Sequence, residues 1–326
     1  MNKVETITVK DEESEMRLDK WFRVHFPEVG YTYLQKLLRS GQVRINSKRA
    51  QANERLYVGQ EIRVPAIVRK VPSKVFNNFS SQTSHVDRKF IESILLFEDD
   101  DVMVLNKPPG LAVQGGSKTF RHIDGLLAGM MDRFGGERPR LVHRLDRDTS
   151  GILLIAKNRF SAKKLGRAFQ TRSAAKTYWA LVKGVPYPQQ GCIEAPLVKS
   201  SGPDGDRVRK ALPGEQDVAQ HAATHYAVID RVSSKAAWLS LKPVTGRQHQ
   251  LRAHMHIIGH PIVGDNKYPG GLDFPAENMD KQLHLHARRL VILHPRNDSK
   301  IDVSAPLPSH MLRTWKLLGL DADKYN

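Results

Sequence analysis

The sequence has little cysteine, few acids relative to bases and no long apolar run. Cys192 is the only cysteine among 326 residues, so neither a disulfide framework nor a cysteine-ligated zinc site can form within the chain. No run approaches the roughly 18 apolar residues of a membrane-spanning helix. Residues 1–15 are acidic and polar, without the apolar core of a signal peptide. We therefore expect a reducing, cytoplasmic location and no membrane contact.

Basic residues outnumber acidic ones widely. Lys and Arg total 51 against 34 Asp and Glu, a net charge of +17. Such an excess attracts polyanions, which favours a nucleic-acid partner over general solubility or contact with an anionic membrane. The hydrophobic content of 40% is ordinary for a globular core, and the length predicts two domains.

The N-terminal part predicts a small basic module. Apolar residues recur at helical spacing from Met16 to Phe26, and a second helix is expected over 31–40, ending at Gly41. Short strands are expected at 5–9, 43–46 and 61–65. The stretch 16–65 resembles the αL RNA-binding motif. That resemblance implies phosphate contacts by four basic residues, Lys36, Arg39, Arg44 and Lys48.

We expect an RNA-binding domain over 1–70, a polar linker over 71–88 and a catalytic domain over 89–326. In the last, a hairpin is predicted at 94–105, and strands at 176–184, 222–232, 236–244 and 286–293. Helices are predicted at 123–134, 162–169, 247–258 and 309–320, and a surface loop at 199–217. Strict βαβ alternation is missing, so the fold class is α+β with a mixed, largely antiparallel sheet.

One polar turn is the strongest candidate for chemistry. Residues 143–151, His-Arg-Leu-Asp-Arg-Asp-Thr-Ser-Gly, lie between two apolar strand candidates. An aspartate in a turn is usually structural. Asp146 becomes a useful nucleophile or base if it is desolvated and held by a fixed cation. Arg252 is a candidate for that cation, because it lies at the edge of the apolar stripe of helix 247–258 and can reach into a cleft.

Two metal-dependent alternatives are weaker. Histidines 249, 254, 256, 260, 284 and 286 are numerous, but Gly259 and Pro261 interrupt the helix and no HExxH pairing occurs. The acids at 99–101, or the pair Asp146 and Asp148, could suit a magnesium-dependent nuclease. Such sites usually need three or more acids, and no third is evident. We expect no metal.

Five motifs in order resemble the RluA-type pseudouridine synthases. They occupy residues 105–110, 143–151, 176–184, 245–254 and 259–268, with the αL module in front as in ribosomal members of that family. The loop 113–116 and the Arg147-Asp148 pair are most similar to the C-type branch, which modifies large-subunit ribosomal RNA.

The resemblance implies an isomerisation without cofactor, metal or energy source. Asp146 is then the essential carboxylate, attacking the sugar or the base or taking a sugar proton. Arg252 keeps Asp146 ionised. Tyr178 packs on the uracil and helps to remove a proton, although by residue pattern alone it is a core aromatic of a strand.

The resemblance also implies RNA contacts. Arg144 fills the space that the flipped uridine leaves, and Leu251 lines the base pocket. Further RNA or pocket contacts are expected from Lys107, Arg147, Arg247 and His249.

We expect a monomer that acts on specific uridines of large-subunit (23S) ribosomal RNA, either naked or in the assembling subunit. Three alternatives stay open. They are a non-catalytic RNA-binding assembly factor, a synthase for another ribosomal RNA position or for transfer RNA, and a metal-dependent nuclease.

Overall fold

A computed structural model describes residues 4–26, 29–66, 85–115, 119, 121–202, 205–270 and 276–325. The chain divides into two compact units, Met1–Ser80 and Ser81–Asn326. Most of the segment predicted as a linker, 71–88, lies outside the described residues. Its last four residues lie in helix α3 (His85–Ser93). Across the described residues, no helix has the length and apolarity needed to cross a membrane.

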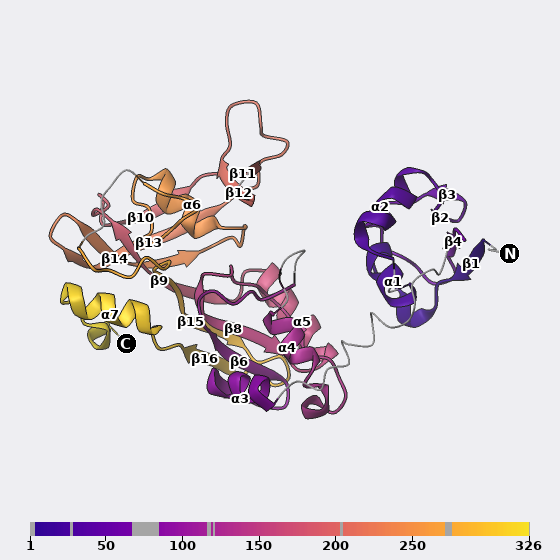
Figure 1. Cartoon of the computed structure of the whole chain (residues 1–326), viewed down its shortest axis with the longest axis horizontal. Helices are drawn as coiled ribbons and strands as arrows, with labels where there is room; N and C mark the ends of the chain where they lie inside the picture. Colours follow the sequence, from indigo (N-terminus) through magenta and orange to yellow (C-terminus); the bar gives the residue numbers. More distant parts are fainter. Residues whose placement is uncertain are drawn as a thin grey trace. The chain divides into compact units, whose positions relative to one another are not determined.

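Among its described residues, the N-terminal unit contains two α-helices, a 3-10 helix at Asp11–Glu13 and a small antiparallel sheet (Figure 1). Its elements are β1 (Glu5–Thr8), α1 (Leu18–His25), α2 (Tyr31–Arg39), β2 (Arg44–Ile45), β3 (Lys48–Arg49) and β4 (Glu61–Val64), with sheet order β1-β4-β2-β3. Leu18, Trp21 and Phe22 recur at i, i+3 and i+4 on α1 and are fully buried. They pack with Leu34 of α2 and Ile62 of β4.

The second unit is organised around a ten-stranded sheet. Eight strands follow the order β10 (Gln190–Glu194), β13 (Ala223–Val232), β14 (Ala236–Pro243), β9 (Ala175–Lys183), β15 (Leu285–Leu293), β8 (Ser150–Ala156), β6 (Val102–Lys107) and β5 (Leu95–Glu98). Strand β16 (Lys300–Ser304) pairs with β15, and β7 (Arg140–Leu141) with β8. Between the described strands of this sheet, pairing is antiparallel except between β8 and β15. The predicted α+β class and largely antiparallel sheet are therefore confirmed.

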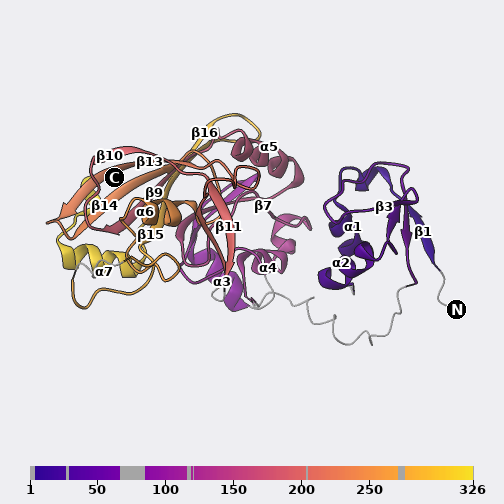
Figure 2. The same ribbon diagram turned by 90° about the horizontal axis from the view of Figure 1, so that it is seen from above.

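Helices cover both faces of this sheet. Besides α3, they are α4 (Ile123–Ala128), α5 (Arg159–Gln170), α6 (Gln250–Ile257) and α7 (Ser309–Leu318). Successive strand residues point to opposite faces. Ala180 of β9 therefore packs in the cluster that holds Leu251 of α6, and Trp179 in the cluster that holds Trp315 of α7. In Figure 2, α3, α4 and α5 lie at the opposite end of the sheet from β10 and β14.

The parallel contact between β8 and β15 explains a glycine of the polar turn. Gly151 has a φ of +104° and pairs with Ala287. A Cβ atom at Gly151 would lie 2.3 Å from the carbonyl oxygen of Ala287. Only glycine adopts this conformation and permits this approach without strain. The turn that ends at Gly151 is therefore fixed to the central sheet.

Two of the predicted elements differ from the structure. Within 199–217, predicted as a surface loop, a hairpin forms from β11 (Leu197–Gly202) and β12 (Gly205–Lys210). Its apolar residues Leu197 and Val208 pack against α6. Charged residues occupy most other positions of β12, so the sequence does not show the apolar–polar alternation of a strand. The helix predicted over 123–134 is shorter. It ends at Ala128, and a separate 3-10 helix follows at Met131–Phe134.

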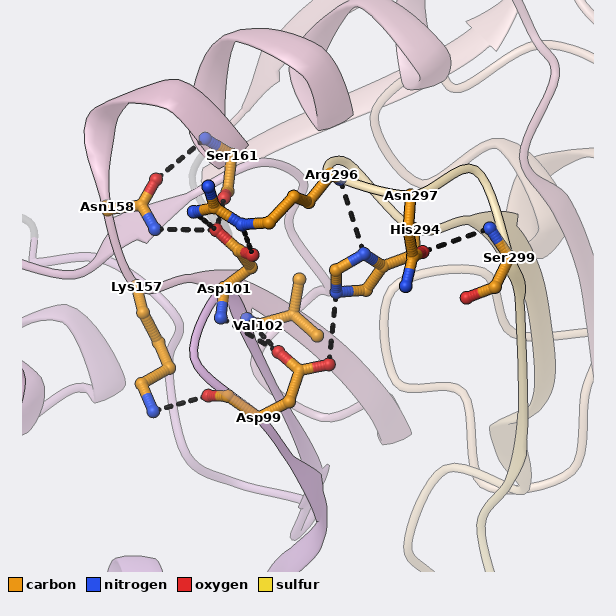
Figure 3. Close-up of polar contacts among 10 residues, drawn as sticks. All are labelled: Asp99, Asp101, Val102, Lys157, Asn158, Ser161, His294, Arg296, Asn297 and Ser299. Carbon is orange, nitrogen blue, oxygen red and sulfur yellow. Dashed lines mark hydrogen bonds and ion pairs between the residues drawn. The ribbon is translucent and has the colours of Figure 1, made fainter.

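Two of the three acids at 99–101, Asp99 and Asp101, serve the fold (Figure 3). Asp101 is 2% exposed and accepts both hydrogen bonds of an Arg296 guanidinium, at 2.5 and 2.7 Å, and one from Ser161. The hydrogen bond from Arg296 is the main cause that lowers the pKa of Asp101. Asp99 accepts a hydrogen bond from His294. These acids thus tie the β5–β6 turn to the β15–β16 turn. No group of three or more His, Cys, Asp or Glu side chains among the described residues is placed to hold a metal ion.

Candidate active site

A cleft of about 640 Å³ contains the polar turn. It is lined by residues 142–146 and 149, by the strand residues Lys176 and Tyr178 of β9, and by 243–252, which lead from β14 into α6. Its volume falls in the range of ligand sites, about 300–1,000 Å³. The structure therefore brings together the second, third and fourth of the five sequence motifs.

Two side chains, the half-buried His143 and the buried Lys107, hold the polar turn in place. The His143 imidazole accepts a hydrogen bond from the Leu154 N–H at 2.8 Å and stacks on Phe169. Burial lowers the pKa of His143 to about 3, so this histidine is neutral and can accept. Lys107 is 0% exposed, and its ammonium donates to the carbonyl oxygens of Pro108, Leu111 and Arg147 at 2.8–2.9 Å.

Lys107 was predicted as an RNA or pocket contact, and its position argues against this. A side chain with no exposure and three internal acceptors does not reach a bound nucleic acid. Burial, opposed by the charges of Asp148 and Asp146, lowers its pKa to about 7. We assign it instead to positioning the loop that carries Asp146.

Asp146 faces two nitrogen-bearing side chains in the cleft. Its carboxylate lies 3.6 Å from Nη1 of Arg252 and 3.9 Å from Nε2 of His249, with 19% of the side chain exposed. Arg252 is 4% exposed. The carboxylate is therefore accessible from the cleft and lies beside a buried cation, as the sequence predicted for Arg252.

Arg252 has a second and closer partner in Asp265. Its Nε and Nη2 atoms each donate to an oxygen of Asp265 at 2.7 Å. The side chain of Asp265 has 0% exposure and also accepts hydrogen bonds from the N–H groups of Lys267 and Tyr268. Burial lowers the pKa of Arg252, but the hydrogen bond and charge of Asp265, then the charge of Asp146, raise it overall.

His249 links the site to the β11–β12 hairpin. Its Nδ1 lies 3.1 Å from the hydroxyl of Tyr268, which accepts a hydrogen bond from the Val208 N–H of β12 at 2.8 Å. Burial lowers the pKa of His249, with Asp146 opposing. A neutral His249 leaves Arg252 as the cation beside Asp146.

Tyr178 contributes an aromatic wall. It lines the cleft and packs against two apolar clusters. One contains Ile152 and Leu154 of β8, and the other contains Leu251 of α6. Burial, and then the charge of Asp146, raises the pKa of its hydroxyl. The group is a protonated phenol at neutral pH.

Other predicted contacts differ in exposure. Arg144 is exposed and lines the cleft, as does the half-buried Arg247, while Leu251 is buried at its wall. Nε of Arg247 donates to the His221 carbonyl at 3.0 Å. Arg147 is exposed, pairs with Asp148 and is not among the residues that line the cleft.

In the N-terminal unit, Lys36, Arg39 and Lys48 are exposed. Arg44 is half-buried, and its guanidinium donates to the carbonyls of Gly41 and Ser47. These two hydrogen bonds occupy part of the Arg44 guanidinium. Arg44 therefore has fewer N–H groups available for a phosphate than it would have as a fully exposed side chain.

Comparison with known proteins assigns the fold to a family. The model for RNA pseudouridylate synthases matches residues 101–256. The ribosomal large subunit pseudouridine synthase C of Rickettsia bellii is 35% identical over 300 residues, covering 91% of this chain and 96% of that protein. The chain belongs to the RluA-type RNA pseudouridine synthase family. The synthase C of Vibrio cholerae is 33% identical, covering 95% and 97% of the two chains.

A solved structure of the pseudouridine synthase family agrees. Human RNA pseudouridylate synthase domain containing 4 is 28% identical, with a TM-score of 0.61, and covers 76% of this chain and 99% of that one. The match confirms the family predicted from the motifs.

Sequence reasoning missed Asp265 and Tyr268. Both lie in the motif 259–268, and an aspartate followed by N–H groups it can cap is a recognisable turn signal. That signal predicts a turn, but it does not indicate that the same carboxylate binds Arg252.

Proposed function

We propose that this chain isomerises specific uridines of large-subunit ribosomal RNA to pseudouridine, with Asp146 as the essential carboxylate. The family assignment supports the reaction, and the names of the relatives from Rickettsia bellii and Vibrio cholerae support the RNA. The single observation that carries the catalytic proposal is the Asp146 carboxylate at 3.6 Å from the buried Arg252 in the cleft.

The reaction rearranges atoms already present in the uridine. The bond from ribose C1′ to ring N1 breaks, the base turns, and a bond from C1′ to C5 forms. C5 loses its proton and N1 gains one, so no oxidant, reductant or energy source is needed. Asp146 is the group in the cleft suited to attack C1′ or the base, or to take a sugar proton.

Arg252 supplies fixed positive charge to this carboxylate. A buried guanidinium attracts the negative charge of a nearby carboxylate and holds its orientation. The two hydrogen bonds to Asp265 fix the plane of the guanidinium and leave Nη1 directed to Asp146. Such a preorganised charge needs no rearrangement when charge develops during the reaction.

Tyr178 has two roles in this account. Its ring forms a wall on which the uracil packs. Its hydroxyl already carries a proton, so it can accept the C5 proton only if it releases its own. Burial and the charge of Asp146 raise the pKa of this hydroxyl, so Tyr178 holds its own proton until another group accepts it as the C5 proton arrives.

Arg144 is the proposed substitute for the flipped base. Extracting a uridine from its stack costs a few kcal/mol. Arg144 is exposed at the cleft, and a planar guanidinium stacks on neighbouring bases while it binds phosphate. Arg247, His249 and Leu251 complete the pocket around the base.

The N-terminal unit is proposed as an αL-type RNA-binding domain that acts within a monomer. Lys36, Arg39 and Lys48 are among its exposed basic residues. Tethering a second weak site raises the overall affinity without new contacts at the catalytic cleft. A ribosomal RNA or assembling-subunit substrate places the reaction in the cytoplasm.

The test is a map of pseudouridines in ribosomal and transfer RNA from cells with and without this protein. We expect defined pseudouridines of large-subunit RNA to be missing in its absence and restored by the chain. Loss confined to transfer RNA would redirect the substrate assignment. An unchanged map accompanied by defective subunit assembly would favour the non-catalytic assembly factor. RNA fragments that a chelator suppresses would instead favour a nuclease.

A further inference from the structure

A second groove adjoins the catalytic cleft. It has a volume of about 430 Å³ and shares four lining residues with the cleft: Arg172, Lys176, Pro243 and Val244. Its five basic residues are Arg172, Lys176, His225, Lys242 and Arg289, and we name it the flank groove. A polymer leaving the cleft across Lys176 therefore enters the flank groove next.

The sheet register aligns the floor of the flank groove. His225 of β13 pairs with Lys242 of β14, and Thr177 of β9 pairs with Arg289 of β15. Leu241 pairs with Tyr178, so Lys242 and Thr177 come opposite one another one residue further along. Paired residues of antiparallel strands project to the same face. These four residues form one row across four strands, on the face opposite Tyr178.

The flank groove has the electrostatic character of an RNA-backbone site. Within the part of the chain that the structure describes, no carboxylate is among the residues that line it. Asp302, just outside it, pairs with Arg289 at 2.7 Å, and 52% of the Arg289 side chain remains exposed. Lys242 and His225 are also exposed. Successive basic side chains along a groove that continues a reaction cleft suit successive phosphates.

We propose that the flank groove binds the phosphodiester backbone of the RNA segment adjoining the target uridine. It holds the strand as it passes round the end of β9 and β14, so that a uridine turned into the cleft stays attached to an anchored neighbour. This inference rests on the proposed function, because it assumes an RNA substrate in the cleft. It adds a place for RNA beyond the catalytic pocket and separate from the N-terminal unit.

The experiment compares Lys242→Gln and Lys242→Glu with Lys235→Gln in the full chain. Lys235 is the matched control, because it is exposed in the turn at the opposite end of the same β13–β14 hairpin. The substrates are two transcripts with the same mapped target uridine, one with long flanks and one cut to the few nucleotides around the target. Turnover, KM and the dependence of RNA affinity on salt are measured on both, and thermal unfolding checks the fold of each variant.

We expect Lys242→Gln to raise KM on the long RNA by about three- to tenfold and to lower the salt slope of affinity by about 0.7, the value for one single-strand phosphate contact. Lys242→Glu should raise KM on the long RNA further than Lys242→Gln does. On the short RNA, the effect of Lys242→Gln on KM should be smaller. Lys235→Gln should match the unsubstituted chain on both RNAs. Equal effects of Lys242→Gln on both RNAs, or no difference from Lys235→Gln, would overturn the flank groove. If the unsubstituted chain makes no pseudouridine in either RNA, the proposed function itself fails.

Discussion

Arg252 forms its bidentate ion pair with Asp265, while Asp146 lies further away. Both Arg252–Asp265 hydrogen bonds are 2.7 Å, and the nearest contact of Arg252 to Asp146 is 3.6 Å. Asp265 therefore holds the guanidinium on the side away from Asp146, and the carboxylate of Asp146 stays accessible from the cleft. This division of roles makes Asp265 a positioning residue.

Replacing Asp265 should affect both stability and turnover. Breaking a buried ion pair by removing one partner costs about 3–5 kcal/mol, because a buried charge is left without a partner. We predict that Asp265→Asn lowers the free energy of unfolding by an amount of this order and lowers kcat more than it raises KM. Urea unfolding and single-turnover kinetics measure the two effects.

Asp302→Asn is the matched control for Asp265→Asn. Arg289 and Asp302 form a pair of the same geometry, with two hydrogen bonds of 2.7 Å, but both side chains are exposed. Exposed pairs contribute about 0–1 kcal/mol, so the control should unfold nearly as the unsubstituted chain does. Equal destabilisation by the two substitutions would contradict the importance of burial at Asp265.

Two substitutions of Tyr178 distinguish a packing role of its ring from a proton-transfer role of its hydroxyl. Tyr178→Phe keeps the ring and removes the hydroxyl, so RNA affinity should stay near its original value. Turnover should fall by about 100-fold or more, the usual contribution of a general acid or base. Tyr178→Leu should also weaken binding. Full activity of Tyr178→Phe would show that the hydroxyl has no role in catalysis and that Tyr178 contributes only its ring.

Arg144 should matter most where the target uridine is stacked. We predict that Arg144→Ala lowers turnover strongly on a structured RNA and less on an RNA in which the uridine is already unstacked. The reason is that unstacking costs a few kcal/mol, and the exposed guanidinium offsets part of it. Turnover of this variant on paired and unpaired versions of one target measures the difference. Equal losses on both RNAs would argue against a flipping role.

The buried His286 should make the folded state less stable in acid. It is 0% exposed, and burial lowers its pKa to about 3. An unfolded histidine takes up a proton near pH 6.5, so acid favours the unfolded state between about pH 6.5 and 3. Going from pH 7 to pH 5 should remove about 2 kcal/mol of stability through this residue alone. Urea unfolding should show a smaller fall between these pH values for His286→Gln, and an unchanged fall would exclude His286 as the cause.

Motif spacing predicted much of the candidate site because the motifs contain the side chains and the turns that position them. Asp146 and Arg252 are over 100 residues apart, yet the family motifs that contain them line one cleft. Helical spacing placed Arg252 at the edge of an apolar stripe, and the structure has it buried with access to the cleft. The sheet class followed from the missing βαβ alternation.

The remaining features depend on tertiary contacts that a linear pattern does not show. Lys107 has the charge of an RNA contact, but its three carbonyl acceptors come together only when the 108–111 loop folds over the polar turn. Strand β12 has charged residues at most positions, and its pairing became evident only from Val208 packing on α6. Asp265 needed the position of Arg252 before its role could be recognised.

The most direct test of the account is pseudouridine formation by Asp146→Asn compared with Asp148→Asn. The two acids lie on the same turn, and Asp148 is 41% exposed and pairs with Arg147 outside the residues that line the cleft. We predict no detectable pseudouridine from Asp146→Asn, with RNA binding and unfolding close to those of the unsubstituted chain, and substantial activity from Asp148→Asn. Clear turnover by a folded Asp146→Asn variant would contradict the central claim.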